Sequence, residues 1–419
     1  MGRWASVFLI WVLALASCSS ENPNFRYGYQ SSSTRPTVLG ANGGPGSGQS
    51  ARHIAILLPL TGPHAGVGAI LLQAAQLAFQ GEAGSSLDVL DTAGTPSGAA
   101  NAVSAAVSHG DGVILGPLTS AETAQVAPAA QSAGIPVLAF TNDATQARPG
   151  VWPLGISPGQ QVRRLVAAVQ AQGHTQLAAL LPDTDFGHVM ASALQDALQS
   201  NGLPNAQIRM HAAGMSSITA AIRDLSDYAG RRGPIDARIK SLKNEGTAEA
   251  RRQIADLQRS RIPPPPFDAL LLADTGDALQ EIAAVLPYYD VDRGAVQILG
   301  PSLWADRASG SGAVPGAWYA APDSTIRASF VRDYQDRYGA APPQIADVAY
   351  DAALIGRYAS TSSGSLLTAL TQPSGFIGSD GLVVLTADGR VRRGLAVFKV
   401  GGTMIAPPPD SSAPNGAGL

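Results

Sequence analysis

The part of the chain between Arg52 and Gly401 alternates short apolar runs with longer alanine-rich stretches. The runs are rich in Val, Ile, Leu and Ala and span about four to six residues, which is typical of strands buried on both faces. The predicted strands are Ile54–Leu58, Leu87–Leu90, Gly112–Leu115, Ile135–Phe140, Leu177–Leu181, Ile208–Ala212, Ala269–Ala273 and Val296–Leu299.

Helical periodicity separates most of these runs. In the stretch 159–173 the apolar residues fall at i, i+3, i+4 and i+7, which places them on one helical face. Strands that alternate with helices at intervals of about 25 to 35 residues indicate βαβ units and parallel sheets covered on both sides. About ten such strands form two sheets, so we predict an α/β fold.

The two ends of the chain have a different composition. A positive start is followed by an apolar run from Val7 to Ala16, which is too short to span a membrane and is typical of a secretion signal. The run ends in Leu-Ala-Ser-Cys, which resembles the lipobox of bacterial lipoproteins, where Cys18 becomes the acylated first residue. The alternative is an ordinary signal with an incidental cysteine. Ser19 after the cysteine favours the outer membrane.

Residues 18–51 are rich in Gly, Ser, Pro and Asn and have almost no apolar periodicity. We predict a flexible tether after a signal peptide at 1–17, with a typical end-to-end distance of about 30 Å. The segment 403–419 has a similar composition and is predicted to be a disordered tail.

Composition excludes several classes of function. Hydrophobic residues make up 45% of the chain, which excludes general disorder, and a net charge of −3 argues against a nucleic-acid binder. The single cysteine excludes a disulfide framework, a thiolate zinc site and an iron–sulfur cluster. The six histidines are scattered and form no H-E-x-x-H motif, so we expect no metal site and no cofactor.

One motif suggests a hydrolase but fails on inspection. Gly155–Gly159 fits G-x-S-x-G, yet the residue after the serine is Pro158, which has no N–H to contribute to an oxyanion hole. Ser157, with Gln160 three residues later, is better interpreted as the capping box of a helix. We therefore expect no catalytic activity.

Several longer segments resemble a known family. IAILLPLTGPHAGVGAILLQAAQLAF, GVILGPLTSAETAQVAPAAQSAGIPVLAFTNDA and LLPDTDFGHVMASALQDALQSNG are similar, in this order, to type I periplasmic binding proteins of the branched-chain amino-acid class. The resemblance implies two Rossmann-like lobes with parallel sheets, joined by three crossings near Ser157, Asp323 and Asp380. Lobe 1 would comprise 52–157 and 324–380, and lobe 2 would comprise 158–323 and 381–402.

The resemblance also implies a ligand cleft between the lobes. Ser120 matches the position that holds a ligand carboxylate, and Thr141 and Asn142 match the loop that grips the ligand backbone. The acidic residue that holds the amine in this class is replaced by Ser302, and Asp274 is a possible substitute. The candidate cleft residues are Thr119, Ser120, Thr141, Asn142, Phe186, Asp274, Thr275 and Ser302.

An insertion at 228–266 departs from the import receptors. Between Arg231 and Arg261 nine Lys and Arg stand against four Asp and Glu, a net charge of +5 that leaves −8 on the rest of the chain. We predict a helical segment that ends before the proline run Pro263–Pro266. It resembles an Arg-rich stretch in the lipoprotein activators of penicillin-binding proteins, although those proteins typically have a further N-terminal helical domain. A solvated helical decoration without a partner is the alternative.

Two hypotheses for function follow. The first is a non-catalytic lipoprotein, anchored at the periplasmic face of the outer membrane, that contacts a peptidoglycan synthase (a penicillin-binding protein). Arg231, Arg232, Arg251 and Arg252 would then bind the partner. The second is a solute receptor of an ABC importer that binds an amino acid or another small polar ligand.

Overall fold

The computed structural model describes most of the chain and contains sheets of five, seven and four strands. The predicted signal peptide, Cys18 and most of the predicted tether lie outside the described residues. The described residues are 36–39, 53–80, 87–260, 262–291, 294–306 and 309–409. Within them, the predicted α/β class with parallel sheets is confirmed, and all eight predicted strands are present, with ends that shift by at most two residues.

The five-stranded sheet forms the centre of lobe 1. Its strands run parallel in the order β3-β2-β4-β5-β6, with Ile54 paired to both Leu87 and Val113. Their bounds are β2 (Ile54–Leu58), β3 (Leu87–Asp91), β4 (Val113–Leu115), β5 (Val137–Ala139) and β6 (Val151–Pro153).

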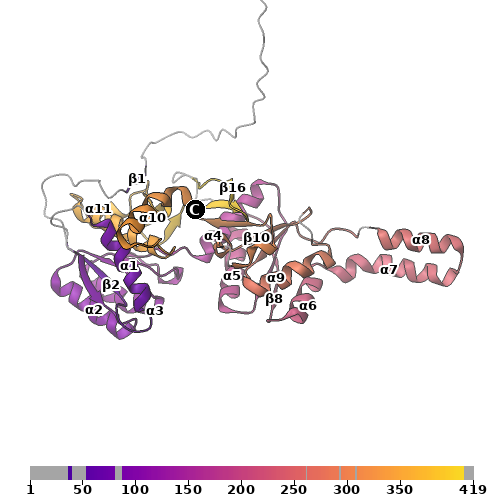
Figure 1. Ribbon diagram of the computed structural model, residues 1–419, viewed down its shortest axis with the longest axis horizontal. Coiled ribbons are helices and arrows are strands. Elements are labelled where there is room, and N and C mark those ends of the chain that lie inside the picture. The colour runs from indigo at the N-terminus through magenta and orange to yellow at the C-terminus, as the bar shows by residue number, and fades with distance from the viewer. Residues whose placement is uncertain are drawn as a thin grey trace, which may run out of the picture. The chain divides into compact units, whose positions relative to one another are not determined.

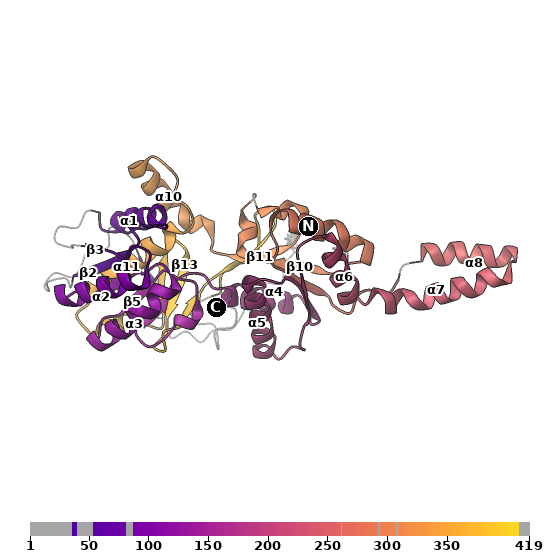
Figure 2. The same ribbon diagram turned by 90° about the horizontal axis from the view of Figure 1, so that it is seen from below.

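Helices cover both faces of this sheet because its strands are apolar on both sides. α1 (Ala65–Ala78), α10 (Ser324–Tyr338) and α11 (Ala346–Thr361) share one hydrophobic core with one face. α2 (Pro96–His109) and α3 (Ser120–Ala133) share a second core with the other face. Figure 2 shows α1 and α2 with the strands between them.

The seven-stranded sheet forms lobe 2, in the order β16-β15-β11-β10-β9-β7-β8. The five neighbouring strands β8, β7, β9, β10 and β11 run parallel. β15 is antiparallel to β11, and β16 is antiparallel to β15. Their bounds are β7 (Leu177–Pro182), β8 (Gln207–His211), β9 (Ala269–Leu272), β10 (Gln297–Gly300), β11 (Trp318–Ala321), β15 (Ala396–Lys399) and β16 (Thr403–Ala406).

The helices of lobe 2 also divide between the two faces. α4 (Pro158–Ala171) and α5 (Asp185–Ser200) pack on one face, while α6 (Met215–Leu225) and α9 (Gly276–Val285) pack on the other. The capping box predicted for α4 is confirmed. The Ser157 side chain accepts from the Gln160 N–H, and the Gln160 side chain accepts from the Ser157 N–H.

The third crossing lies later in the chain than predicted. The four-stranded sheet consists of β1 (Thr37–Val38), β12 (Phe376–Gly378), β13 (Gly381–Leu385) and β14 (Val391–Arg393). The last three strands and α12 (Leu366–Leu370) pack against the lobe 1 core. The chain therefore passes into lobe 2 at residues 394–395, and Asp380 lies in the turn between β12 and β13. Sequence could not separate two successive apolar strand pairs that belong to different lobes.

Both terminal segments contain short strands that composition did not reveal. β1 (Thr37–Val38), within the predicted tether, pairs in parallel with β12. β16, within the predicted tail, pairs with β15. The partner of β1 lies far along the chain, so no local pattern marks β1, whereas β15 and β16 form a hairpin joined by the short turn at 400–402.

The insertion is helical, as predicted, but it consists of two helices that form a hairpin. α7 (Tyr228–Glu245) and α8 (Ala248–Arg259) pack against each other, and the connection to the body runs through α6. Figures 1 and 2 both show the two helices side by side and extended beyond the lobe 2 sheet. Among the helices within the described ranges, none is both long and apolar enough to cross a membrane.

Two helical glycines differ in how closely the neighbouring backbone approaches them. A Cβ at Gly187, in the first turn of α5, would lie 1.9 Å from the carbonyl oxygen of Pro182, whereas a Cβ at Gly233 in α7 would meet nothing within 4 Å. Gly187→Ala should therefore lower the free energy of unfolding by about 1–3 kcal/mol. Gly233→Ala should raise it by about 0.5–1 kcal/mol, because alanine loses less entropy in a helix. Urea denaturation measures both, and a neutral Gly187→Ala would contradict the close approach.

Candidate functional site

A cavity of about 650 Å³ lies where the two lobes meet, at the carboxyl ends of their parallel strands. Thr119 and Ser120 follow β4, Thr141 and Asn142 follow β5, and Ser302 follows β10. The fold therefore brings five of the predicted cleft residues together. Carboxyl ends of neighbouring parallel strands are the usual place for a ligand in open α/β sheets.

The other three predicted cleft residues lie elsewhere. Phe186 lines an adjacent cavity of about 600 Å³, which shares Asn142 with the first. Thr275 is exposed at the start of α9, and neither it nor Asp274 lines either cavity. Asp274 is buried, and its carboxylate lies 3.2 Å from Nε2 of His211.

The suggestion that Asp274 could hold a ligand amine is therefore wrong. Its charge is already matched inside lobe 2. Burial lowers the pKa of His211, but the hydrogen bonds to Asp274 and to the Ala212 carbonyl, together with the charge of Asp274, outweigh burial, and the net effect raises the pKa. Sequence alone did not reveal this pairing, because His211 ends β8 and Asp274 follows β9, 63 residues later.

The position that would receive a ligand carboxylate already faces a carboxylate. The Ser120 hydroxyl donates to Asp143, which also accepts from the N–H and hydroxyl of Thr145. Burial raises the pKa of Asp143, but these hydrogen bonds outweigh it and the net pKa is lowered. Asp143 is therefore ionised at neutral pH, and it repels a second carboxylate placed at Ser120.

Arg393 and Asp380 line the same cavity and carry its other charges. The Arg393 side chain is only 1% exposed; its Nη2 donates to the Leu154 carbonyl at 2.5 Å, and its Nη1 lies 3.9 Å from Asp380. Among the described residues, Nε and Nη1 of Arg393 have no hydrogen-bond partner. The cavity wall thus holds a buried cation with unused donors.

Two further carboxylates lie behind Asp380. Asp351 accepts from the N–H of Ser379 at 2.6 Å and from the N–H of Asp380 at 3.2 Å. Asp347 accepts a two-pronged hydrogen bond from Arg327. The cluster thus contains three buried carboxyl groups and two guanidinium groups. When one carboxyl group keeps its proton, the two remaining negative charges balance the two positive charges.

The raised pKa values of Asp380 and Asp351 agree with one retained proton in this cluster. Burial, followed by repulsion from Asp347, raises the pKa of Asp380 to about 7. Burial, followed by repulsion from Asp380, raises the pKa of Asp351 to about 6. The junction between the lobes therefore contains a group that titrates near neutrality.

Sequence analysis missed Asp143 and Arg393, although each had a local signal. Asp143 directly follows the predicted Thr141 and Asn142. Arg393 is two residues after Val391 in the same strand, and alternation places both on one face. Because Val391 belongs to the lobe 1 core, that face points inward.

The predicted partner-binding arginines divide into two groups. Arg231 is buried, and its guanidinium donates at 2.7 Å to the carbonyl oxygens of Ser226, Pro263 and Tyr289. It therefore anchors the base of the hairpin, and its assignment to the partner surface is wrong. The other three lie outward: Arg232 is half-exposed and pairs with Asp236 at 3.0 Å, while Arg251 and Arg252 are exposed.

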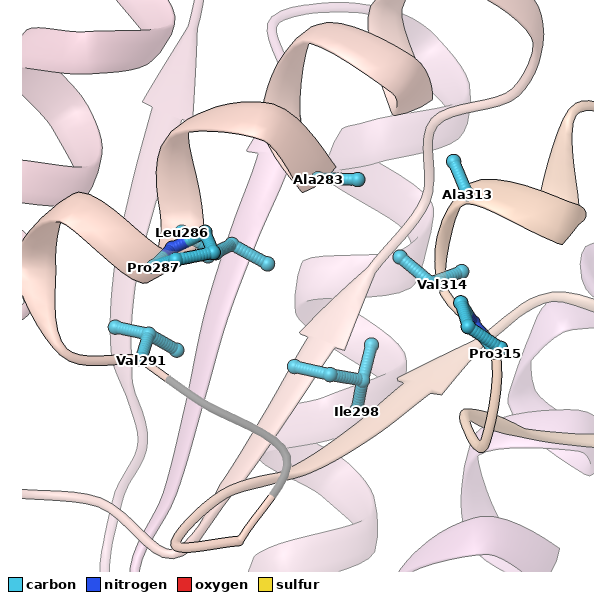
Figure 3. A pocket seen from close by; sticks show the side chains of 8 residues that line it. All are labelled: Ala283, Leu286, Pro287, Val291, Ile298, Ala313, Val314 and Pro315. Carbon is cyan, nitrogen blue, oxygen red and sulfur yellow. The ribbon is translucent and has the colours of Figure 1, made fainter.

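A third cavity, of about 330 Å³, lies within lobe 2 (Figure 3). Its side chains are all apolar and come from α9, the turn after it, β10 and the segment before β11. They are Ala283, Leu286, Pro287, Val291, Ile298, Ala313, Val314 and Pro315. Without a polar side chain to orient a solute, this cavity lacks the usual features of a specific binding site.

Comparison with known families decides the classification. A model of periplasmic binding proteins matches residues 52–403. The chain belongs to the periplasmic binding protein family. No curated protein matches it in sequence. The family explains the two lobes and the cavity between them, and it implies a periplasmic location.

Solved structures share this periplasmic binding protein fold at low sequence identity. A protein from Rhodospirillum rubrum, named for branched-chain amino acid ABC transport, is 20% identical with a TM-score of 0.61, over 85% of this chain and 99% of that one. The C-domain of LpoA from Haemophilus influenzae, described as a regulator of PBP1A, is 17% identical with a TM-score of 0.60, over 84% and 99%.

Full-length LpoA from the same organism gives a TM-score of 0.59 at 17% identity, over 86% of this chain but only 59% of that one. The likeness therefore covers one part of that protein. At these identities the neighbours of this periplasmic binding protein show its fold and leave its specific role open.

The carboxyl cluster leads to a prediction on pH. Asp380 has a folded pKa of about 7, against a usual value of 3.8, so between these values the folded state binds the extra proton. The stability that this group contributes is fully present below about pH 4 and is lost as the pH rises through 7. Asp380→Asn, which keeps the shape but cannot ionise, should make the fall in unfolding free energy from pH 5 to pH 8 smaller.

Urea denaturation at both pH values measures the effect. Asp388→Asn is the matched control, because hydrogen bonds from Thr386 and Arg390 lower the pKa of Asp388 to about 2. Asp388 is ionised at both pH values, so its substitution should leave the fall unchanged. An unaltered fall in Asp380→Asn would contradict a proton held at this site.

Proposed function

We propose that this periplasmic binding protein is a non-catalytic lipoprotein of the outer membrane that regulates a peptidoglycan synthase through its basic helical hairpin. The hairpin is the observation that carries the proposal. It extends from lobe 2, and its extensive contacts within the described chain are those between α7 and α8 and between α7 and α6. A helical arm of this kind adds little to the core of the body and leaves its surface free for a partner.

The charge of the hairpin suits an acidic partner surface. Its internal seam is narrow, with Ile239, Leu242 and Ala250 buried. Six basic residues are exposed, against four acidic ones, and one of the acidic ones, Asp236, is paired with Arg232. The exposed basic residues are Arg238, Lys240, Lys243, Arg251, Arg252 and Arg259. Long-range attraction by such a surface speeds encounter with a negatively charged partner.

The cleft supports the same proposal because it is poorly suited to an amino acid. Asp143 opposes a ligand carboxylate at Ser120. At Ser302, where an acidic side chain would hold the amine, the backbone N–H donates to Gln161 at 2.7 Å. A buried ammonium without a carboxylate partner would lose several kcal/mol. LpoA, described as a regulator of PBP1A, is a precedent for this fold in such a role.

The proposed anchor limits the distance between body and membrane. Eighteen residues separate Cys18 from Thr37, the first residue of β1. At most about 3.3–3.6 Å per residue, this segment reaches roughly 60–65 Å. Lobe 1, which pairs with β1, would stay within that distance of the lipid.

A second candidate function is the capture of a small solute for an ABC importer. One observation favours it: Arg393, whose buried Nε and Nη1 have no hydrogen-bond partner among the described residues, borders a cavity of about 650 Å³. A ligand with acceptor oxygens, placed away from Asp143, would satisfy them.

Binding to a purified class A penicillin-binding protein of the same organism tests the first function. Arg251→Glu combined with Arg252→Glu should weaken binding at least tenfold, because both side chains are exposed and the change reverses two charges. Arg332→Glu, on exposed α10 of lobe 1, is the control and should bind as the wild type does. No binding by the wild type, or equal binding by the double variant, would overturn the proposal.

Thermal-shift measurements with amino acids and small organic anions test the second function. A true ligand at 100 times its dissociation constant should add about 2.7 kcal/mol to the free energy of unfolding. Arg393→Gln should abolish the shift if the cavity holds the ligand. A shift that persists in this variant would exclude Arg393 as the anchor.

A further inference from the structure

Four ionisable residues meet at the amino-terminal edge of the lobe 1 sheet. His53 directly precedes β2, Asp88 lies near the start of β3, His109 ends α2, and Asp111 stands two residues before β4. The order β3-β2-β4 makes these parallel strands neighbours, so their amino ends lie at one edge. This edge is opposite to the carboxyl edge that forms the cavity between the lobes.

Three of these side chains converge. One ligand atom each from Asp88, His109 and Asp111 can be chosen so that all three lie within 4.8 Å of one another. Nδ1 of His109 is 2.6 Å from Oδ2 of Asp88. The His109 side chain is 54% exposed, whereas Asp111 is buried. The cluster thus has a buried carboxylate at its base and an imidazole open to solvent.

The buried carboxylate is incompletely satisfied. Asp111 is 3% exposed, and within the described part of the chain its Oδ2 has no hydrogen-bond partner. A buried polar atom without a partner costs about 1–3 kcal/mol, more when the group is charged. Asp88 places a second carboxylate beside Asp111, within the same cluster. A cation between the two carboxylates would relieve both the unmet hydrogen bond and the repulsion.

We propose that Asp88, His109 and Asp111 bind a divalent transition-metal ion, with Zn²⁺ as the best fit, at the amino edge of lobe 1. Imidazole together with carboxylate oxygens is a donor set that suits zinc, whereas calcium and magnesium take oxygen donors alone. His53, which directly precedes β2, the strand between β3 and β4, is the candidate for a fourth ligand. The ion would link α2, β3 and β4.

Such a site acts on lobe 1 alone. Its ligands lie at the opposite edge of the sheet from Thr119 and Thr141, so the ion contacts no residue of the cavity between the lobes. Its effect is structural, because it joins the end of α2, the start of β3 and the residues before β4, in addition to the hydrogen bond between His109 and Asp88. Binding to the folded state alone raises stability in proportion to occupancy.

Competition of the full chain against a chromogenic chelator for Zn²⁺ tests the proposal. We expect one ion per chain, and at least tenfold weaker binding in His109→Gln and in Asp111→Asn. His188→Gln is the matched control: His188 and Asp183 form an exposed pair at 2.9 Å and do not belong to the three-residue cluster. It should bind as the wild type does.

Co²⁺ absorption and unfolding without metal complete the test. The wild type should show Co²⁺ ligand-field bands that His109→Gln loses. In the presence of chelator, the unfolding free energy of both variants should be close to that of the wild type, because His109 is exposed and Asn matches the shape of Asp. If Asp111→Asn does not fold, His109→Gln decides by itself. No Zn²⁺ binding at micromolar concentration, undiminished binding in His109→Gln, or loss of binding in His188→Gln would overturn the proposal.

Discussion

Parallel strand pairing is the constraint on which the arrangement of this protein depends. All strands of the lobe 1 sheet, and five consecutive strands of the lobe 2 sheet, run in one direction within their sheet. Each sheet therefore has one edge of carboxyl ends and one edge of amino ends. Short loops at the first edge supply the cavity between the lobes, and short loops at the second bring Asp88, His109 and Asp111 together. Two chemically different clusters thus arise from one geometric rule.

The junction between the lobes depends on buried charge. Arg393, at the end of β14, donates to the Leu154 carbonyl just before the first crossing, and it faces Asp380. The Asp351 carboxylate accepts a hydrogen bond from the backbone N–H of Asp380 and so fixes the turn that contains Asp380. Two of the three crossings are therefore connected by one hydrogen-bonded network. Buried ion pairs contribute little net stability, but they cost much when a partner is removed, so this network specifies one geometry at the junction.

The cavity and the hairpin relate to two different roles of a periplasmic binding protein: the cavity to the binding of a solute, and the hairpin to contact with another protein. In the cavity, Asp143 and the Ser302 backbone take the places where an amino acid would be anchored. The hairpin adds a surface that owes little to the two-lobed body, because Arg231 connects it through backbone carbonyl oxygens at its base. The ionised Asp143 beside Ser120 and the basic hairpin both support the proposed contact with a protein partner.

The sequence predicted those features whose causes are local. Eight strands are short apolar runs, most of them buried on both faces, and their positions were predicted within two residues, whereas β6 and β11 were not predicted. The Ser157 cap and the helical character of the insertion also follow from neighbouring residues, whereas its division into two helices was not predicted. Helix 3.6-residue periodicity, capping and proline positions act over a few residues, and a single sequence displays them fully.

Only the tertiary structure decided the features that join distant segments. β1 exists because β12, far along the chain, offers it a free edge. Asp274 proved to be the partner of His211, and Arg231 proved to face inward. The cluster at Asp111 unites scattered residues without any motif spacing. The physical reason is the same in each case: pairing, burial and coordination are decided by which elements pack together, and a linear pattern does not contain that information.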